Sequence, residues 1–217
     1  SQDDDIDFEI RWMTPTAEVR LCGHATIAAA HVLYEHLDFD RDQIRFSSRS
    51  GPLSVERDDA GRIVLDFPEI EIVPCEATPE LIEGLGIEPV SVFHSYDKIC
   101  VLESEQQVRD LQVDHRKLLQ VPDVRSIAVT ARGDHCDFVA RLFAPAVGID
   151  EDPVTGSLYT MLGPYWSKVL GKQRMEAQQV SARMGHIQVQ VRPDKPGRVL
   201  IAGHAVTYLT GQIYTQA

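Results

Sequence analysis

Apolar and polar residues alternate along several short segments of the chain, and this alternation predicts β-strands. In the first such segment, residues 8–13, apolar Phe8, Ile10 and Trp12 are separated by charged residues, and residues 14–16 are expected to end the strand. Residues 44–67 contain short strands separated by Gly, Pro and Asp, which is typical of an antiparallel meander. The same signals predict further strands at residues 90–94, 98–102, 126–131, 137–143, 178–183, 187–191, 199–202 and 205–214.

Two longer segments are apolar on every side and predict helices that are surrounded by protein. The first covers residues 25–37, after Cys22-Gly23-His24, and the second covers residues 158–172. Pro164 removes one backbone hydrogen bond from the second helix, which costs about 3 kcal/mol unless its surroundings compensate. Shorter helices are expected at residues 79–86 and 105–111.

The predicted order is a strand, an apolar helix and several strands, and then the same order again. Because strands come in consecutive runs, the pattern predicts an α+β fold rather than a parallel doubly wound sheet. We expect two pseudo-symmetric lobes, each a curved, mostly antiparallel sheet wrapped around a central apolar helix. Residues 1–77 are assigned to the N-terminal lobe, joined by a last strand at 204–217, and residues 78–203 to the C-terminal lobe. A cleft between the lobes would let both helix N-termini face one ligand.

The formal net charge is −12. Such acidity argues against nucleic acid and anionic membranes as partners, because both require clustered Lys and Arg. No apolar segment reaches the ~18 residues that a membrane span needs. The four cysteines lie far apart, without metal-ligand spacing, which is typical of reduced thiols in a cytoplasmic protein: Cys22, Cys75, Cys100 and Cys136.

Two helix starts are the candidates for chemistry, because the first N–H groups of a helix lack intrahelical acceptors and can hold a carboxylate. His24 lies at the first and could transfer a proton, or could cap the helix or pack. Asp152 lies before the second, at residues 152–157. It could cap the helix, bind a substrate amino group or move a proton. Phosphate-binding, dinucleotide-binding and Gly-x-Ser-x-Gly hydrolase motifs are absent.

Residues 14–26 resemble the first signature of the phenazine biosynthesis PhzF-like family, and residues 150–157 resemble the second. Residues 163–166, 181–185 and 203–206 resemble further segments of that family. The resemblance implies a diaminopimelate-epimerase-like fold and a cofactor-independent isomerase that moves a proton on a small carboxylated substrate. It also implies a homodimer.

By the same resemblance, His24 and Asp152 are the catalytic residues of the site. The substrate-binding residues are those of the two turns: Gly23, Thr155, Gly156 and Ser157. Cys22 lies where related two-cysteine epimerases keep one catalytic thiol, but Thr155 lies near the place of the other. A racemisation with two cysteine bases is therefore not expected, and Cys22 is expected to pack.

The resemblance also leaves one role unassigned. Family members have about fifty further residues before the first motif, including a Ser-Glu-Thr-like stretch with the catalytic glutamate, whereas this sequence starts just after that point. None of Glu9, Glu18 or Glu35 lies in such a context. A second function therefore stays open, namely a non-catalytic protein on the same fold that binds a small anion or is completed by a partner.

Overall fold

The computed structural model describes residues 6–13, 18–19, 21–122, 124–212 and 214, so the turn predicted at 14–16 lies outside the described residues. The chain forms two compact units, residues 1–65 with 203–217 and residues 66–202. The sequence places this boundary after residue 77. In the structure, residues 66–77 belong to the second unit, where β7 (Val73–Cys75) pairs with β8 (Ser91–His94).

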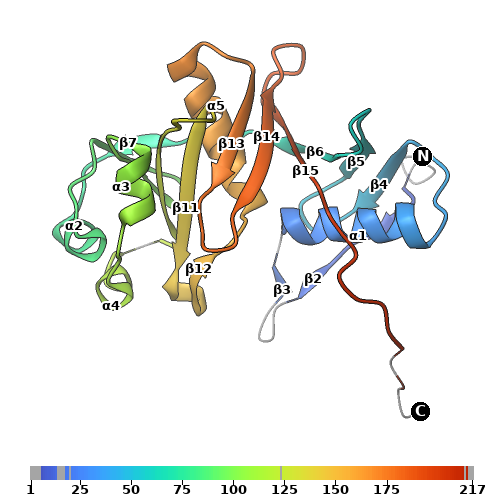
Figure 1. The fold of residues 1–217 in the computed structure, drawn as a ribbon, viewed down its shortest axis with the longest axis horizontal. Helices are drawn as coiled ribbons and strands as arrows, with labels where there is room; N and C mark the ends of the chain where they lie inside the picture. The colour runs from blue at the N-terminus through green and yellow to red at the C-terminus, as the bar shows by residue number, and fades with distance from the viewer. Residues whose placement is uncertain (1–5, 14–17, 20, 123, 213, 215–217) are drawn as a thin grey trace. The chain divides into compact units, whose positions relative to one another are not determined.

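The first unit contains short strands and one long helix (Figure 1). Four of its strands lie in the order β1 (Phe8–Glu9), β4 (Gln43–Ser47), β5 (Leu53–Arg57) and β6 (Ile63–Pro68), of which β6 continues past the boundary of the unit at residue 65. β1 joins β4 in parallel, and β4 joins β5 antiparallel. The alternating apolar positions of β4 to β6 are buried, as their pattern predicts: Ile44, Phe46, Leu53, Val55, Ile63, Leu65 and Phe67.

The single strand predicted at residues 8–13 is divided between two partners. β1 pairs with β4, whereas β2 (Trp12–Met13) pairs antiparallel with β3 (Glu18–Val19). The side chains of Ile10 and Trp12 are nevertheless buried, whereas that of Phe8 is 38% exposed, so the predicted inward face is kept only at the later two positions.

Helix α1 (Gly23–His36) forms close to its predicted position but is buried along one face. Its buried residues are Gly23, Thr26 and Ala30, whose spacing of three or four residues defines one side of a helix. By contrast, the side chain of Val32 is 44% exposed. This differs from the fully enclosed helix that the sequence predicts, because the described residues of the first unit cover only that one side.

The strand predicted at residues 205–214 is wrong for the described residues, none of which is in a strand there. A strand needs a neighbour for its backbone hydrogen bonds, and no described strand pairs with this segment. Its apolar side chains are exposed, by 83% at Val206 and 98% at Tyr208. Thr207 Oγ1 lies 3.0 Å from His31 Nε2 and 2.6 Å from His36 Nε2, so the segment contacts α1 through side chains.

The second unit is built on a mixed sheet with helices around it (Figure 1). Most neighbouring strands are antiparallel, but β10 joins β9 in parallel and β11 joins β13 in parallel. The short strand β12 (Ile149–Asp152) pairs with β11 outside the main order. That order is β15 (Arg198–Gly203), β14 (Gly185–Val191), β13 (Arg174–Gln179), β11 (Phe138–Ala144), β10 (Ile127–Arg132), β9 (Lys98–Val101), β8 and β7.

The second apolar helix is enclosed over most of its length, although the side chain of Val169 near its end is 56% exposed. A 3-10 turn, η2 (Gly156–Leu158), leads into α5 (Tyr159–Leu170), which packs against β13 and β14. Gly163 is required here, because a Cβ atom at this position would lie 2.6 Å from Val189 Cγ1. Pro164 is buried within the helix, which continues past it to a left-handed Gly171.

Three short helices cover a second group of buried side chains: α2 (Pro79–Leu85), α3 (Glu105–Asp110) and α4 (His115–Leu118). Helix α4 was not predicted, because four residues are too few to show a helical period. The apolar residues beneath include Leu81, Val108, Leu118, Ile127 and Phe143. None of the helices in the described part of the chain combines the length and apolar character needed to cross a membrane.

Candidate active site

Asp152 ends strand β12, opposite Leu142 of β11. Its half-buried carboxylate is held by the residues that follow it: Oδ2 accepts a hydrogen bond from Thr155 Oγ1 at 2.7 Å, and Oδ1 accepts one from Val154 N at 3.3 Å. A carboxylate offers about four acceptor positions. The geometry therefore fixes the carboxylate and leaves acceptor positions for another molecule.

The helix-cap alternative for Asp152 does not hold. The residue before α5 is Leu158 and the residue before the 3-10 turn is Thr155, and neither helix start has a side-chain cap hydrogen bond. Asp152 instead closes the turn that precedes the 3-10 turn, through hydrogen bonds from Val154 and Thr155. The sequence did not reveal this because the 3-10 turn lies between the aspartate and the α-helix.

The N–H groups of Gly156 and Ser157 lie in the first turn of this helical segment, where backbone N–H groups have no acceptor inside the helix. Gly156 is buried and Ser157 is half-buried. Thr160 Oγ1 donates to the Ser157 carbonyl at 2.7 Å, which closes the turn from the helix side. Three predicted substrate-binding residues, Thr155 to Ser157, are thus placed together with Asp152.

Gln179, at the end of β13, holds this turn in place, although no sequence motif points to its role. Its fully buried amide donates from Nε2 to the Asp152 carbonyl at 2.7 Å and accepts at Oε1 from Thr155 N at 2.8 Å. Ser181 Oγ donates to the Pro153 carbonyl at 2.9 Å. Residues 181–185 resemble a family segment, and that resemblance is the one signal that could have pointed to Ser181.

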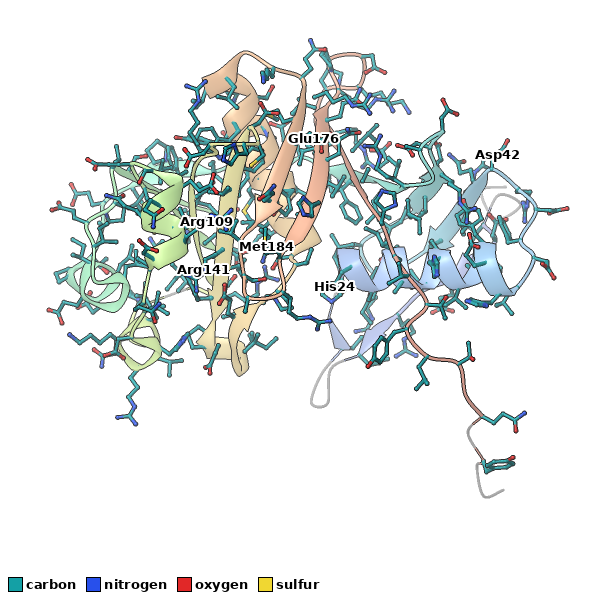
Figure 2. All side chains as sticks on the ribbon, viewed as in Figure 1. His24, Asp42, Arg109, Arg141, Glu176 and Met184 are labelled. Atoms are coloured by element: carbon teal, nitrogen blue, oxygen red, sulfur yellow. The ribbon has the colours of Figure 1, made fainter. Side chains whose placement is uncertain are left out.

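Arg141 of β11 fixes the strand from the other side. Its guanidinium forms two hydrogen bonds with the carboxylate of Glu151, at 2.7 and 3.0 Å. It also donates from Nη1 to the carbonyls of Val108 and Leu111 in the α3 region. Figure 2 shows Arg141 beside Arg109 of α3. Glu151 is therefore used to anchor β12, and Asp152 is the carboxylate of this pair that remains available.

In the first unit, Cys22 precedes α1 and Gly23 begins it (Figure 2 labels His24 at this helix start). The His24 side chain is exposed rather than packed in a core, and its Nε2 lies 3.4 Å from Cys22 Sγ. Thr26 Oγ1 accepts from the buried Trp12 Nε1 at 3.1 Å and donates to the Cys22 carbonyl at 2.8 Å. This chain of hydrogen bonds fixes the backbone from which His24 projects.

The predicted site residues are therefore distributed over both units. Asp152, Thr155, Gly156 and Ser157 form one turn in the second unit, and Gly23 and His24 form the helix start in the first. The single cleft that would join them stays a prediction.

Burial makes several other ionisable groups poor candidates for catalysis. It raises the pKa of the Cys100 thiol to about 12 and that of the Cys136 thiol to about 11, so both remain protonated at neutral pH. Burial also raises the pKa of Tyr159, with Cys136 and Asp152 adding to the effect. Within the described residues, no group of three or more His, Cys, Asp or Glu side chains could hold a metal ion.

Comparison with known proteins places these motifs in a family. The profile of the PhzC-PhzF family, described as phenazine biosynthesis-like protein, matches residues 1–211. An uncharacterised isomerase of Pseudomonas aeruginosa is 50% identical over 207 residues, which cover 95% of this chain and 77% of that protein.

Solved structures agree with the sequence match. A putative phenazine biosynthesis PhzC/PhzF protein from Clostridium difficile superposes with a TM-score of 0.88 at 42% identity, over 95% of this chain and 78% of that one. A probable proline racemase from Agrobacterium radiobacter, solved with bound carbonate, superposes with a TM-score of 0.62 at 11% identity, over 100% of this chain and 74% of that one. The latter shows a shared fold. The predicted α+β, epimerase-like fold is confirmed, and the chain belongs to the PhzC-PhzF family of phenazine biosynthesis-like proteins.

Proposed function

We propose that this protein is an isomerase that moves a proton on a small carboxylated metabolite without a cofactor. The observation that carries the proposal is the Asp152 carboxylate, which is fixed by Thr155 and Val154 next to the free N–H groups of a helix start. The isomerase name of the Pseudomonas aeruginosa relative supports the same reaction class.

The residues of the turn have complementary roles in this proposal. The N–H groups of Gly156 and Ser157 hold the substrate carboxylate, because a helix start carries partial positive charge. Asp152 exchanges a proton with the substrate, since a carboxylate held by neighbouring donors is oriented for transfer. His24 of the first unit is the second candidate for proton transfer. The reaction removes one proton from carbon and returns one at another position or face, so no oxidant or reductant is needed.

The proposal is tested by replacing Asp152 with asparagine. In deuterated buffer, the 217-residue protein is incubated with a panel of small carboxylates, and deuterium incorporation is followed by NMR and mass spectrometry. Asp152→Asn is expected to slow incorporation about 100-fold or more, which is typical for the loss of a general acid or base. Asp150→Asn is the matched control, because Asp150 is an exposed carboxylate on the same strand. An Asp152→Asn protein that keeps wild-type exchange would contradict the proposal.

The second candidate function is small-anion binding without turnover on the same fold. The same turn also suits this function, because the first-turn N–H groups of Gly156 and Ser157 can hold an anion without any proton transfer. Carboxylate binding that saturates in calorimetry, with no deuterium entering the bound molecule, would identify this function instead.

A further inference from the structure

We propose that Arg125 is a second anion-binding residue of this site, whose guanidinium receives the carboxylate of the substrate. This inference rests on the proposed function and names a residue that neither motif contains. Arg125 lies in the second unit, just before β10, and so in the same unit as Asp152.

A buried carboxylate holds the guanidinium in one orientation. Asp97 is fully buried, and its two oxygens accept hydrogen bonds from Arg125 Nε at 3.0 Å and Nη2 at 2.7 Å. Ser126 Oγ donates to the same carboxylate at 2.6 Å. The Arg125 guanidinium also lies over the ring of Tyr96, 5.2 Å from its centre. The plane of the guanidinium is therefore set before any ligand arrives.

The opposite side of this guanidinium is available. A guanidinium has five N–H groups, and two of them donate to Asp97. For the other three, the described residues provide no acceptor, and the Arg125 side chain is 45% exposed. A planar pair of N–H groups matches the two oxygens of a carboxylate. The arrangement can thus bind a carboxylate without losing the hydrogen bonds to Asp97.

Two observations connect Arg125 with the Asp152 turn. The strand register gives the first: Ala128, three residues after Arg125, lies opposite Leu142 of β11, and Leu142 lies opposite Asp152 of β12. In addition, burial lowers the pKa of Arg125, but the hydrogen bond and charge of Asp97 outweigh this effect and raise it, and Tyr96 and Asp152 contribute in the same direction. Arg125 thus precedes a strand that lies two strands away from the one that Asp152 ends, and the charge of Asp152 adds to the rise in the pKa of the guanidinium.

A purely structural role would consist of neutralising Asp97, since a buried carboxylate needs a paired cation. That role uses two N–H groups and predicts no response to a ligand. Ligand binding by the remaining N–H groups is thus the property that separates the two roles.

The test uses the full 217-residue protein with 15N-labelled arginine and benzoate as the probe, at constant ionic strength. The Nε–H signal of Arg125 is assigned as the signal that disappears in Arg125→Lys. Benzoate is expected to shift this signal in a saturable manner, whereas neutral benzamide leaves it in place. Arg125→Lys should weaken benzoate binding, measured by calorimetry, about tenfold or more. The matched control, Arg132→Lys, changes an exposed arginine at the other end of β10 and should bind as the wild type does.

An Arg125 signal that benzoate does not shift, or an Arg125→Lys protein that binds benzoate within twofold of the wild type, would overturn the inference. If Arg125→Lys does not fold, Arg125→Gln provides the assignment, and the titration of the wild type then decides the question. The Asp152→Asn exchange experiment gives a separate readout. If Arg125 does not respond to benzoate but Asp152-dependent exchange is intact, the inference about Arg125 fails and the proposed function stands. If Arg125 responds but no Asp152-dependent exchange is found, the proposed function fails and anion binding by Arg125 stands.

Discussion

At the scale of single residues, the turn that carries Asp152 is held partly by its own residues and partly by side chains that the sequence motifs do not contain. Thr155 and Val154 hold the carboxylate of Asp152, while Gln179 bonds the backbone on both sides of it. Arg141 anchors the neighbouring Glu151 and keeps it from acting as a second free carboxylate. The conformation of the turn is therefore set in part by residues that lie outside it in the chain.

Replacement of Gln179 by leucine is expected to destabilise the protein by about 2–5 kcal/mol, because it leaves the Asp152 carbonyl and Thr155 N–H buried without partners. Urea unfolding measures this change in the free energy of unfolding. Gln178→Leu is the control, since successive strand residues point to opposite faces. Equal stability of the Gln179→Leu and wild-type proteins would show that the amide does not hold the turn.

The stability contributed by Glu105 is expected to depend on pH. Burial acts to raise the pKa of this carboxyl, but the hydrogen bond from Asp134 N and the pairing with Arg109 outweigh burial and lower it below 4.5. A lowered folded-state pKa stabilises the protein above the unfolded pKa, and the contribution is lost as the pH falls through the folded pKa.

Glu105→Gln should therefore be less stable than the wild type in urea at pH 7. The difference in the free energy of unfolding should shrink as the pH falls below the pKa of this carboxyl in the unfolded chain. Glu76→Gln, an exposed glutamate, provides the comparison and should show a small difference at every pH. A difference for Glu105→Gln that grows on acidification would contradict the sign of the shift.

At the scale of elements, the two apolar helices differ in how they are packed. Helix α5 is buried along most of its length and lies directly against β14 through Gly163. Helix α1 is buried along one face in the described residues. The same all-apolar pattern therefore corresponds to different burial, because burial depends on what each unit places around the helix.

Gly163→Ala is expected to destabilise the protein by about 1–3 kcal/mol, although alanine is the better helix former, because the new Cβ would clash with Val189. Thermal or urea unfolding measures the loss. A second change, Val189→Ala, should remove the clash and make the double variant more stable than the sum of the two single effects predicts. Strict additivity would show that this contact does not require glycine. Lys168→Ala, on an exposed position of α5, is the control for helix propensity.

At the scale of the whole molecule, each of the two units carries one helix start with a candidate catalytic residue. Because the net charge is −12, the overall electrostatic field of the protein does not attract anions. Any anion must be held by local groups, such as helix N–H groups or individual arginines. The expected homodimer and the shared cleft stay predictions, which light scattering and a liganded crystal structure would test.

The sequence alone determined the α+β class, most strands, both long helices and the two turns that carry the candidate chemistry, because hydrophobic period and turn residues act locally. Tertiary structure decided what is held by contacts between distant residues. It placed Gln179 against Asp152, divided residues 8–13 between two strand partners and left residues 205–212 without a strand. It also turned Arg125 toward a buried Asp97, 28 residues away in the chain. Such contacts leave no periodic signal, since they depend on which segments meet after folding.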